Sequence, residues 1–186
     1  MNFINLPHDK MDQGIETALA LVGEFAGLDH LFLYLYNEDL SGFSRGYEWS
    51  AKGDLDYFAH VKDMQIDLNG WWIRKFQRQQ MIYVPDISQL PPEAQTEKDI
   101  FAKVGIRSIL GVPLIYNDQL IGAFAFDSHK PQEGWDPEMV EVMRILAEIF
   151  VSTIMRKKAQ EDLQAFQSKM FRAEQLASVG TLSATV

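Results

Sequence analysis

The chain of 186 residues contains no cysteine. This absence excludes disulfide bonds, thiolate metal ligands, cysteine nucleophiles and cofactors attached through a thioether. Long apolar runs are also missing, since no segment approaches the ~18 apolar residues that a membrane-spanning helix needs. The opening stretch, MNFINLPHDK, lacks the basic start and apolar run of a signal peptide. We therefore expect a cytoplasmic protein without a membrane span.

Basic residues are scarce, with 17 Lys and Arg against 26 Asp and Glu and a formal net charge of −9. Nucleic-acid binding requires a basic face, so the acidic balance argues against it. The charge reverses in residues 156–186, which carry 5 basic and 3 acidic residues. Arg156, Lys157 and Lys158 are too few for a polybasic membrane patch, and we interpret them as a solvated stretch of helix.

Two segments near the start predict a helix followed by a β-hairpin. Apolar residues recur every three or four positions in residues 12–27, which is typical of a helix. The run LFLYLY, residues 31–36, is apolar on both alternating faces and predicts a central strand covered on both sides. Residues 43–50, FSRGYEWS, alternate in the manner of a strand, with Phe43, Tyr47 and Trp49 expected on one face.

The middle of the chain predicts short elements and a second hairpin. Asn117 and Asp118, both turn formers, separate two apolar runs in residues 107–128 and predict the hairpin turn. The remaining elements are expected as a short strand at 64–68, short helix at 71–79, strand at 81–86, and a helix over 90–105 that prolines introduce and Gly105 ends. This order of elements predicts an α+β domain with an antiparallel sheet flanked by helices.

A long helix is predicted from Asp136, the expected N-cap, and Pro137 onwards. Its apolar residues follow a seven-residue repeat, which is interrupted at Ser152 and Arg156. The repeat is formed by Val142, Ile145, Ile149, Leu163, Phe166, Met170, Ala173 and Ala177. A repeat of this length is typical of a coiled coil. We expect the helix to pack on the domain at first and to leave it near Arg156. Leu163, Phe166, Met170, Ala173 and Ala177 would then pair with a second copy of the chain in a homodimer.

The second hairpin also carries a family resemblance. GIRSILGVPLIYNDQLIGAFAFDS resembles the core of a GAF domain. Taken in order, GYEWSAKG, WW, YVPDISQLPPEAQTEKD, GIRS, FDS and Trp135 resemble a GAF subgroup of bacterial sensor proteins. The resemblance covers roughly residues 10–156 and implies a GAF-like sensor domain over residues 1–155, with a long C-terminal signalling helix.

The final residues, RAEQLASVGTLSATV, resemble the first helix of a histidine kinase dimerisation domain, just before its phosphoacceptor motif. This resemblance implies that residues 156–186 are a coiled-coil linker and the start of that helix, truncated before the reactive histidine. The parent would be a sensor histidine kinase of a two-component phosphorelay that acts on a response regulator. The fragment itself lacks catalytic parts and is not expected to be an enzyme.

Aromatic residues are the first candidates for a ligand pocket, because aromatic walls suit a small planar or apolar ligand. Tyr47, Trp49, Trp71 and Trp72 stand in two aromatic stretches. Core packing is the alternative, and it stays open for all four.

Two polar residues beside expected strand ends, Ser108 and Asp127, could bind a ligand. Turn and cap hydrogen bonds are the alternative interpretation for both.

The sequence lacks residues that several chemistries of GAF relatives require. Covalent bilin attachment and GAF-type methionine sulfoxide reductase both use cysteine, and the chain has none. The resemblance to cyclic-nucleotide GAF domains is incomplete, because Asn117 precedes Asp118 and not a lysine. The four histidines lack metal-ligand spacing, so we predict no metal and no cofactor. Two hypotheses remain: a sensory module that binds a small ligand or partner and signals through a dimeric helix, or a structural GAF dimerisation module that binds nothing.

Overall fold

A computed structural model describes residues 10–53, 57–132 and 136–183, with backbone alone for His60 and for residues 177–183. Trp135, part of the family resemblance, lies outside these residues. A five-stranded antiparallel sheet forms the centre, in the order β2-β1-β5-β4-β3. The strands are β1 (His30–Tyr36), β2 (Phe43–Ser50), β3 (Ile82–Val84), β4 (Ser108–Tyr116) and β5 (Gln119–Ser128).

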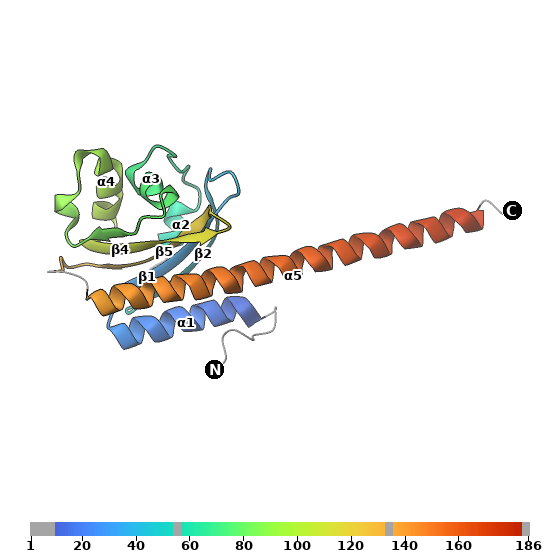
Figure 1. Ribbon diagram of the computed structural model, residues 1–186, viewed down its shortest axis with the longest axis horizontal. Helices are drawn as coiled ribbons and strands as arrows, with labels where there is room; N and C mark the ends of the chain where they lie inside the picture. The colour runs from blue at the N-terminus through green and yellow to red at the C-terminus, as the bar shows by residue number, and fades with distance from the viewer. Residues whose placement is uncertain (1–9, 54–56, 133–135, 184–186) are drawn as a thin grey trace.

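Helices cover both faces of this sheet, as Figure 1 shows. The first face carries α1 (Met11–Ala26) and the start of α5 (Pro137–Ser183). The second face carries the shorter helices α2 (Tyr57–Val61), α3 (Trp71–Gln77) and α4 (Gln95–Lys103), with the 3-10 turns η3 (Ile87–Gln89) and η4 (Pro92–Ala94) before α4. The expected α+β architecture with a flanked antiparallel sheet is confirmed.

The central strand β1 is buried on both faces, as its sequence predicts. Leu31 and Leu33 are fully buried against α1 and α5. Phe32 and Tyr34 point to the opposite face and belong to a second apolar cluster. Side chains of a strand alternate between faces, so one segment contributes to both cores.

The hairpin of β4 and β5 turns at Asn117 and Asp118, as predicted. Their φ angles are +48° and +60°. Two consecutive left-handed residues are the requirement of a type I′ turn, which matches the twist of a two-stranded hairpin. Asn and Asp tolerate this conformation better than most residues do.

The structure corrects two expectations for the irregular parts of the chain. Residues 64–68 form no strand. Phe43 does not share a face with Tyr47 and Trp49, because the pairing of β1 with β2 shifts between Leu35 and Tyr36. Such a bulge inserts one residue and turns the side chains beyond it to the other face. Phe43 therefore joins the aromatic cluster on the α3 side.

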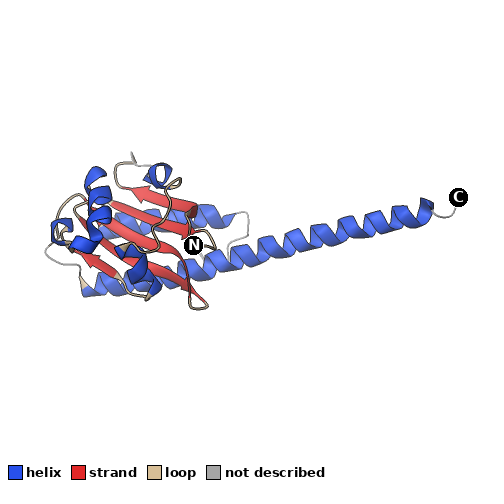
Figure 2. Cartoon of the chain, turned by 90° about the horizontal axis from the view of Figure 1, so that it is seen from above, coloured by secondary structure: helices blue, strands red, loops and turns tan. Residues whose placement is uncertain are grey.

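Helix α5 begins as the sequence predicts and then leaves the domain. The Asp136 carboxylate accepts a hydrogen bond from the Glu138 backbone N–H at 2.9 Å. The helix packs on the sheet through buried residues as far as Lys157, and its described side chains from Lys158 to Leu176 are exposed. Figures 1 and 2 show the rest as a single straight helix pointing away from the sheet. None of the helices in the described residues combines the length and apolarity needed to cross a bilayer.

The packing of α1 on β2 depends on one small residue. A Cβ added at Gly23 would overlap the ring of Trp49. We predict that Gly23→Ala lowers the free energy of unfolding by about 1–3 kcal/mol, although alanine favours helix, because the ring must be displaced. Urea denaturation of the variant measures this loss. In a Trp49→Ala background the same substitution should be neutral or stabilising, and an equal loss there would contradict the proposed overlap.

Candidate functional site

An aromatic pocket lies between the second face of the sheet and the segment that carries α3 and α4. Its cavity measures about 220 Å³. The aromatic residues that line it are Phe32, Tyr34, Tyr36, Phe43, Trp72 and Phe101. They come from β1, β2, α3 and α4, so residues distant in sequence meet here because the bulge and the helical cover bring them to one face.

Small residues on the sheet make room for the pocket. Ala123 of β5 lies on its floor, opposite Tyr34 in the neighbouring strand. Gly111 of β4 lies under the Trp72 ring, and an added Cβ would come within 2.9 Å of that ring. Trp72 also makes edge contacts with Phe76 and Phe101. The ring is thus held by packing on three sides, with its remaining surface towards the cavity.

Apart from the aromatic residues, the polar side chains of the pocket are the neutral Gln65 and Thr96 and the acidic Asp67 and Glu97. One oxygen of Glu97, Oε1, accepts a hydrogen bond from the Trp72 backbone N–H at 2.9 Å and so caps α3. The other oxygen, Oε2, is buried and has no hydrogen-bond partner among the described residues. Asp67 is the second acidic residue in the lining, and no Lys, Arg or His occurs among the described residues that line the cavity. The site therefore offers a negative charge and an acceptor, and no cation for an anionic ligand.

Tyr36 adds a buried phenol to the pocket. Burial strongly raises the pKa of this phenol, and a hydrogen bond with the Trp72 side chain opposes that effect only in part. Tyr36 is therefore neutral at physiological pH and can take part in hydrogen bonds at the pocket wall without bearing charge.

The predicted site residues do not converge on this pocket. Of the six, Trp72 lines it. Trp71 is half-buried on the same side, with the Lys75 ammonium 5.8 Å from the centre of its ring. Tyr47 and Trp49 pair with Leu33 and Leu31 and project to the face covered by α1 and α5. Those two rings therefore belong to the core under α1.

Ser108 and Asp127 have local partners at the strand ends. The Ser108 hydroxyl donates to the Lys130 carbonyl at 2.8 Å, a turn contact. Asp127 is fully buried and lies 2.8 Å from Nδ1 of His30, also fully buried. Burial raises the pKa of the Asp127 carboxyl, although the hydrogen bond with His30 opposes the shift. His30 is the first residue of β1. Among the described residues no group of acidic and histidine side chains could hold a metal ion.

A second polar cluster lies where α5 leaves the domain, and we call Asp12, Arg45, Tyr47 and Lys157 the exit cluster. The Asp12 carboxylate accepts hydrogen bonds from Lys157 at 2.5 and 2.6 Å, from Arg45 at 2.9 Å and from the Tyr47 hydroxyl at 2.5 Å. Burial alone would raise the pKa of Asp12, but these donors and the two cationic charges lower it below the ordinary value.

Lys158, the next residue of α5, also forms an ion pair with the domain. The Lys158 ammonium lies 2.9 Å from the Glu38 carboxylate in the turn between β1 and β2. Sequence reasoning missed this contact, the exit cluster and Glu97, because the partners stand far apart in the chain and form no local pattern.

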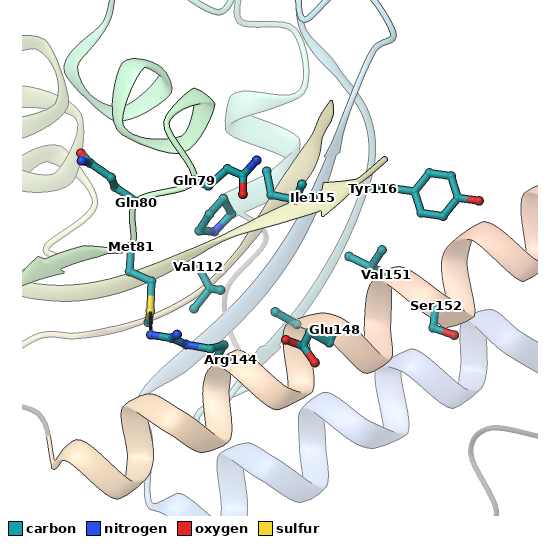
Figure 3. A pocket seen from close by; sticks show the side chains of 12 residues that line it. Gln79, Gln80, Met81, Val112, Ile115, Tyr116, Arg144, Glu148, Val151 and Ser152 are labelled. Atoms are coloured by element: carbon teal, nitrogen blue, oxygen red, sulfur yellow. Dashed lines mark hydrogen bonds between the residues drawn. The ribbon is translucent and has the colours of Figure 1, made fainter. Parts of the chain in front are cut away.

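A wider groove lies between β4 and α5 (Figure 3) and has a volume of about 780 Å³. It exists because the short β3 pairs only with residues 109–111 of β4. Met81 and Arg144 face each other across one end, with sulfur and guanidinium nitrogen 3.6 Å apart. Pro113 lines the groove and cannot donate a backbone hydrogen bond, which weakens this part of β4 as an edge for strand addition.

The exit cluster generates a pH-dependent prediction. Asp12→Asn should lower the free energy of unfolding at pH 7 by about 1 kcal/mol, because Lys157 loses its carboxylate while the 41% exposed Asp12 side chain limits the effect. The pKa of Asp12 is lowered by folding, so its contribution is present above the ordinary value of 3.8 and is lost as the pH falls through the lower folded value. Denaturation curves should therefore differ less between variant and natural chain at pH 2.5 than at pH 7. A difference that grows on acidification would contradict this assignment.

Comparison with known proteins agrees with the geometry. Residues 11–154 match the GAF domain family. The methanogenesis regulatory histidine kinase FilI of Methanothrix harundinacea (strain 6Ac) is 25% identical over 159 residues. That match covers 82% of this chain and only 17% of the length of that protein.

Two solved structures share the fold. GAF3 from Slr1393 of Synechocystis sp. PCC6803 has a TM-score of 0.64 at 20% identity, over 84% of this chain and 99% of that one. The GAF domain from a phosphoenolpyruvate-protein phosphotransferase of Coxiella burnetii has a TM-score of 0.65 at 16% identity, over 86% and 90%. At these identities the likeness concerns the fold alone. With the family match spanning residues 11–154, this chain belongs to the GAF domain family.

Proposed function

We propose that this chain is the sensory part of a longer sensor histidine kinase in a two-component phosphorelay. A small molecule binds in the aromatic pocket, and α5 carries the change of state, as a parallel pair in a homodimer, to a kinase that acts on a response regulator. The observation that carries the proposal is the position of the β1–β2 hairpin. It lines the pocket at one point and holds the base of α5 at another.

The connection runs along both strands of the hairpin. On β1, Tyr36 lines the pocket and Glu38, two residues later, binds Lys158 of α5. On β2, Phe43 lines the pocket, and Arg45 and Tyr47 belong to the exit cluster with Lys157. A ligand that binds one arrangement of this hairpin more tightly shifts the population of α5 positions by its difference in affinity.

The size and the lining residues of the pocket limit which kinds of ligand can bind. Its volume of about 220 Å³ is below the ~300 Å³ at which pockets for drug-sized ligands begin, so the ligand is small. The aromatic lining favours a planar or apolar body. The Glu97 Oε2 atom needs a hydrogen-bond donor, and the described lining supplies no basic side chain to an anion. We therefore expect a neutral or cationic ligand with an N–H group, and not a phosphate ester.

The kinase assignment rests on one relative and on residues 172–186, which we call the tail. The FilI kinase matches most of this chain over a small part of its own length, and the tail resembles a dimerisation helix. The division into a sensor over 1–155 and a coiled-coil linker over 156–186 follows the burial of α5, which ends at Lys157. The side chains of Leu163, Phe166 and Met170 are 55%, 61% and 53% exposed, an arrangement that suits pairing with a second copy. Ala173 is also exposed, and the Ala177 side chain lies outside the described residues.

The alternative is a structural GAF dimerisation module that binds nothing. The packing of Trp72 against Gly111, Phe76 and Phe101 favours it, because these contacts already fill much of the space between the sheet and α3. The two functions differ in one property, which is whether the remaining cavity admits a molecule.

A matched pair of probes tests the ligand chemistry. We predict that 2-phenylethylamine binds the full chain and that phenylacetate, of similar shape and opposite charge, does not. Glu97→Gln retains a carbonyl oxygen that can cap α3 and replaces the second acceptor with an amide, so amine affinity should fall roughly tenfold or more in calorimetric titration. Glu93→Gln, a change outside the cavity lining, is the control and should leave the affinity unchanged. Binding of neither probe, nor of uncharged ethylbenzene, would favour the structural module.

The exposed part of α5 predicts a dimer that depends on the residues after Gln160. The full chain should be a dimer in size-exclusion chromatography with light scattering. Removal of the residues after Gln160 should weaken the dimer, because it deletes Leu163, Phe166 and Met170 from the paired face. A full chain that stays monomeric at high concentration, with an unchanged state after this cut, would exclude signalling through a paired α5.

A further inference from the structure

We propose that the aromatic pocket binds an organic ammonium ion, with the charged nitrogen between Glu97 and Asp67 and the alkyl groups against aromatic rings. This inference rests on the proposed function and deepens it, because it commits the ligand to a cation and gives that cation an orientation. We call Asp67, Gly70 and Glu97 the acidic end of the pocket.

The missing side chain at Gly70 keeps the acidic end open. Gly70 lies in the lining of the cavity, directly before α3. Its φ angle is −56°, which any residue adopts, so the backbone conformation does not require glycine here. A Cβ added at Gly70 would lie 2.9 Å from the Asp67 carbonyl oxygen, 3.2 Å from Glu97 Oε1 and 3.7 Å from Asp67 Cβ. Two acidic residues that stand far apart in the sequence therefore converge on one point of the lining.

Backbone N–H groups hold both carboxylates in place. Glu97 Oε1 accepts a hydrogen bond from Trp72, and Asp67 Oδ1 accepts one from Asn69, each at 2.9 Å. Glu97 Oε2 is buried without a hydrogen-bond partner among the described residues. A buried acceptor in this state costs free energy until a ligand donates to it. An ammonium N–H supplies the missing donor and the opposite charge together, and charge-assisted hydrogen bonds are stronger than neutral ones.

The described lining supplies no cation that would neutralise these carboxylates. Lys, Arg and His are absent from it. Lys98, the neighbour of Glu97, donates instead to the Ser88 carbonyl oxygen at 3.1 Å and does not line the cavity. The two carboxylates therefore repel an anion and leave a neutral ligand without compensation for their charge. A cation is the ligand that this end of the pocket favours.

Aromatic rings beside the acidic end make an organic cation a better fit than a metal ion. Phe101 follows Glu97 by four residues on α4, so the two lie on the same side of that helix. The Trp72 and Phe101 rings meet edge to face with their centroids 5.6 Å apart. Aromatic faces attract cations, and they also pack against the alkyl groups of an organic one. The cavity of about 220 Å³ limits those groups to a few carbon atoms.

Three probes of nearly the same size and shape test this inference on the full chain. The tert-butylammonium ion has a charge and N–H groups, tert-butanol has a hydroxyl donor without a charge, and tetramethylammonium has a charge without an N–H group. We expect tert-butylammonium to bind at neutral pH roughly tenfold more tightly than either of the other two, because it alone satisfies Glu97 in both respects. Ligand-observed NMR titration measures the three affinities.

A conservative substitution locates the bound charge. Asp67→Asn keeps a carbonyl oxygen that can accept from the Asn69 N–H and removes the charge. The affinity for tert-butylammonium should fall roughly threefold or more, while the affinity for tert-butanol should not change. Asp63→Asn, the same substitution outside the cavity lining, is the control and should leave both affinities unchanged. An equal fall for both probes in Asp67→Asn would contradict a role for its charge.

The outcomes separate this inference from the proposed function. Equal or tighter binding of tert-butanol would overturn the ammonium ion and leave a pocket for small molecules in place. Equal binding of tetramethylammonium would overturn the N–H contact with Glu97. Displacement of tert-butylammonium by a lower concentration of Ca²⁺ would overturn the organic ligand in favour of a metal ion. Binding of none of the three probes, nor of 2-phenylethylamine or ethylbenzene, would overturn the ligand-binding function as well.

Discussion

The two-sided burial of β1 and β5 is the constraint on which the rest of the structure depends. Both strands are paired on both edges. β1 carries large apolar side chains on each face, and β5 carries phenylalanines on one face and alanines on the other, so neither face of the sheet can remain in water. The two faces of the sheet are packed differently. Leucine and phenylalanine on one face pack tightly against the long helices α1 and α5. On the other face, aromatic rings of β1 stand beside alanines of β5 under short helices. That uneven surface leaves the aromatic pocket.

The same sheet also joins the two regions that the proposed function connects. The hairpin of β1 and β2 supplies wall residues of the pocket, while Glu38, Arg45 and Tyr47 of the same hairpin contact the base of α5 or its partner Asp12. In the proposed function, a displacement at Tyr36 or Phe43 would be passed along the hairpin, because a packed sheet deforms little. In this mechanism the ion pairs at Lys157 and Lys158 are the points at which two positions of the helix would be distinguished.

Short-range patterns in the sequence were enough to predict much of the fold but little of the candidate site. The double apolar face of residues 31–36, the turn at Asn117 and Asp118 and the cap at Asp136 follow from short-range rules, and the structure agrees with them. The face of Phe43 depends on a bulge that alternation alone does not reveal. Glu97, the His30–Asp127 pair and the exit cluster depend on contacts between distant segments, so no spacing in the sequence indicates them. The stripe of α5 was visible as a repeat, but a repeat does not state which side the sheet will occupy.

The straightness of α5 has a mechanical consequence. From Lys158 to Ser183 the helix extends about 39 Å beyond its last buried residue, at ~1.5 Å per residue. In the proposed function the helix would act as a lever that pivots at the exit cluster, and a tilt of about 5° there would displace Ser183 by about 3 Å. A small movement at the domain would thus become a displacement of roughly the width of an atom. The position of Lys157 along the helix sets the length of that lever arm.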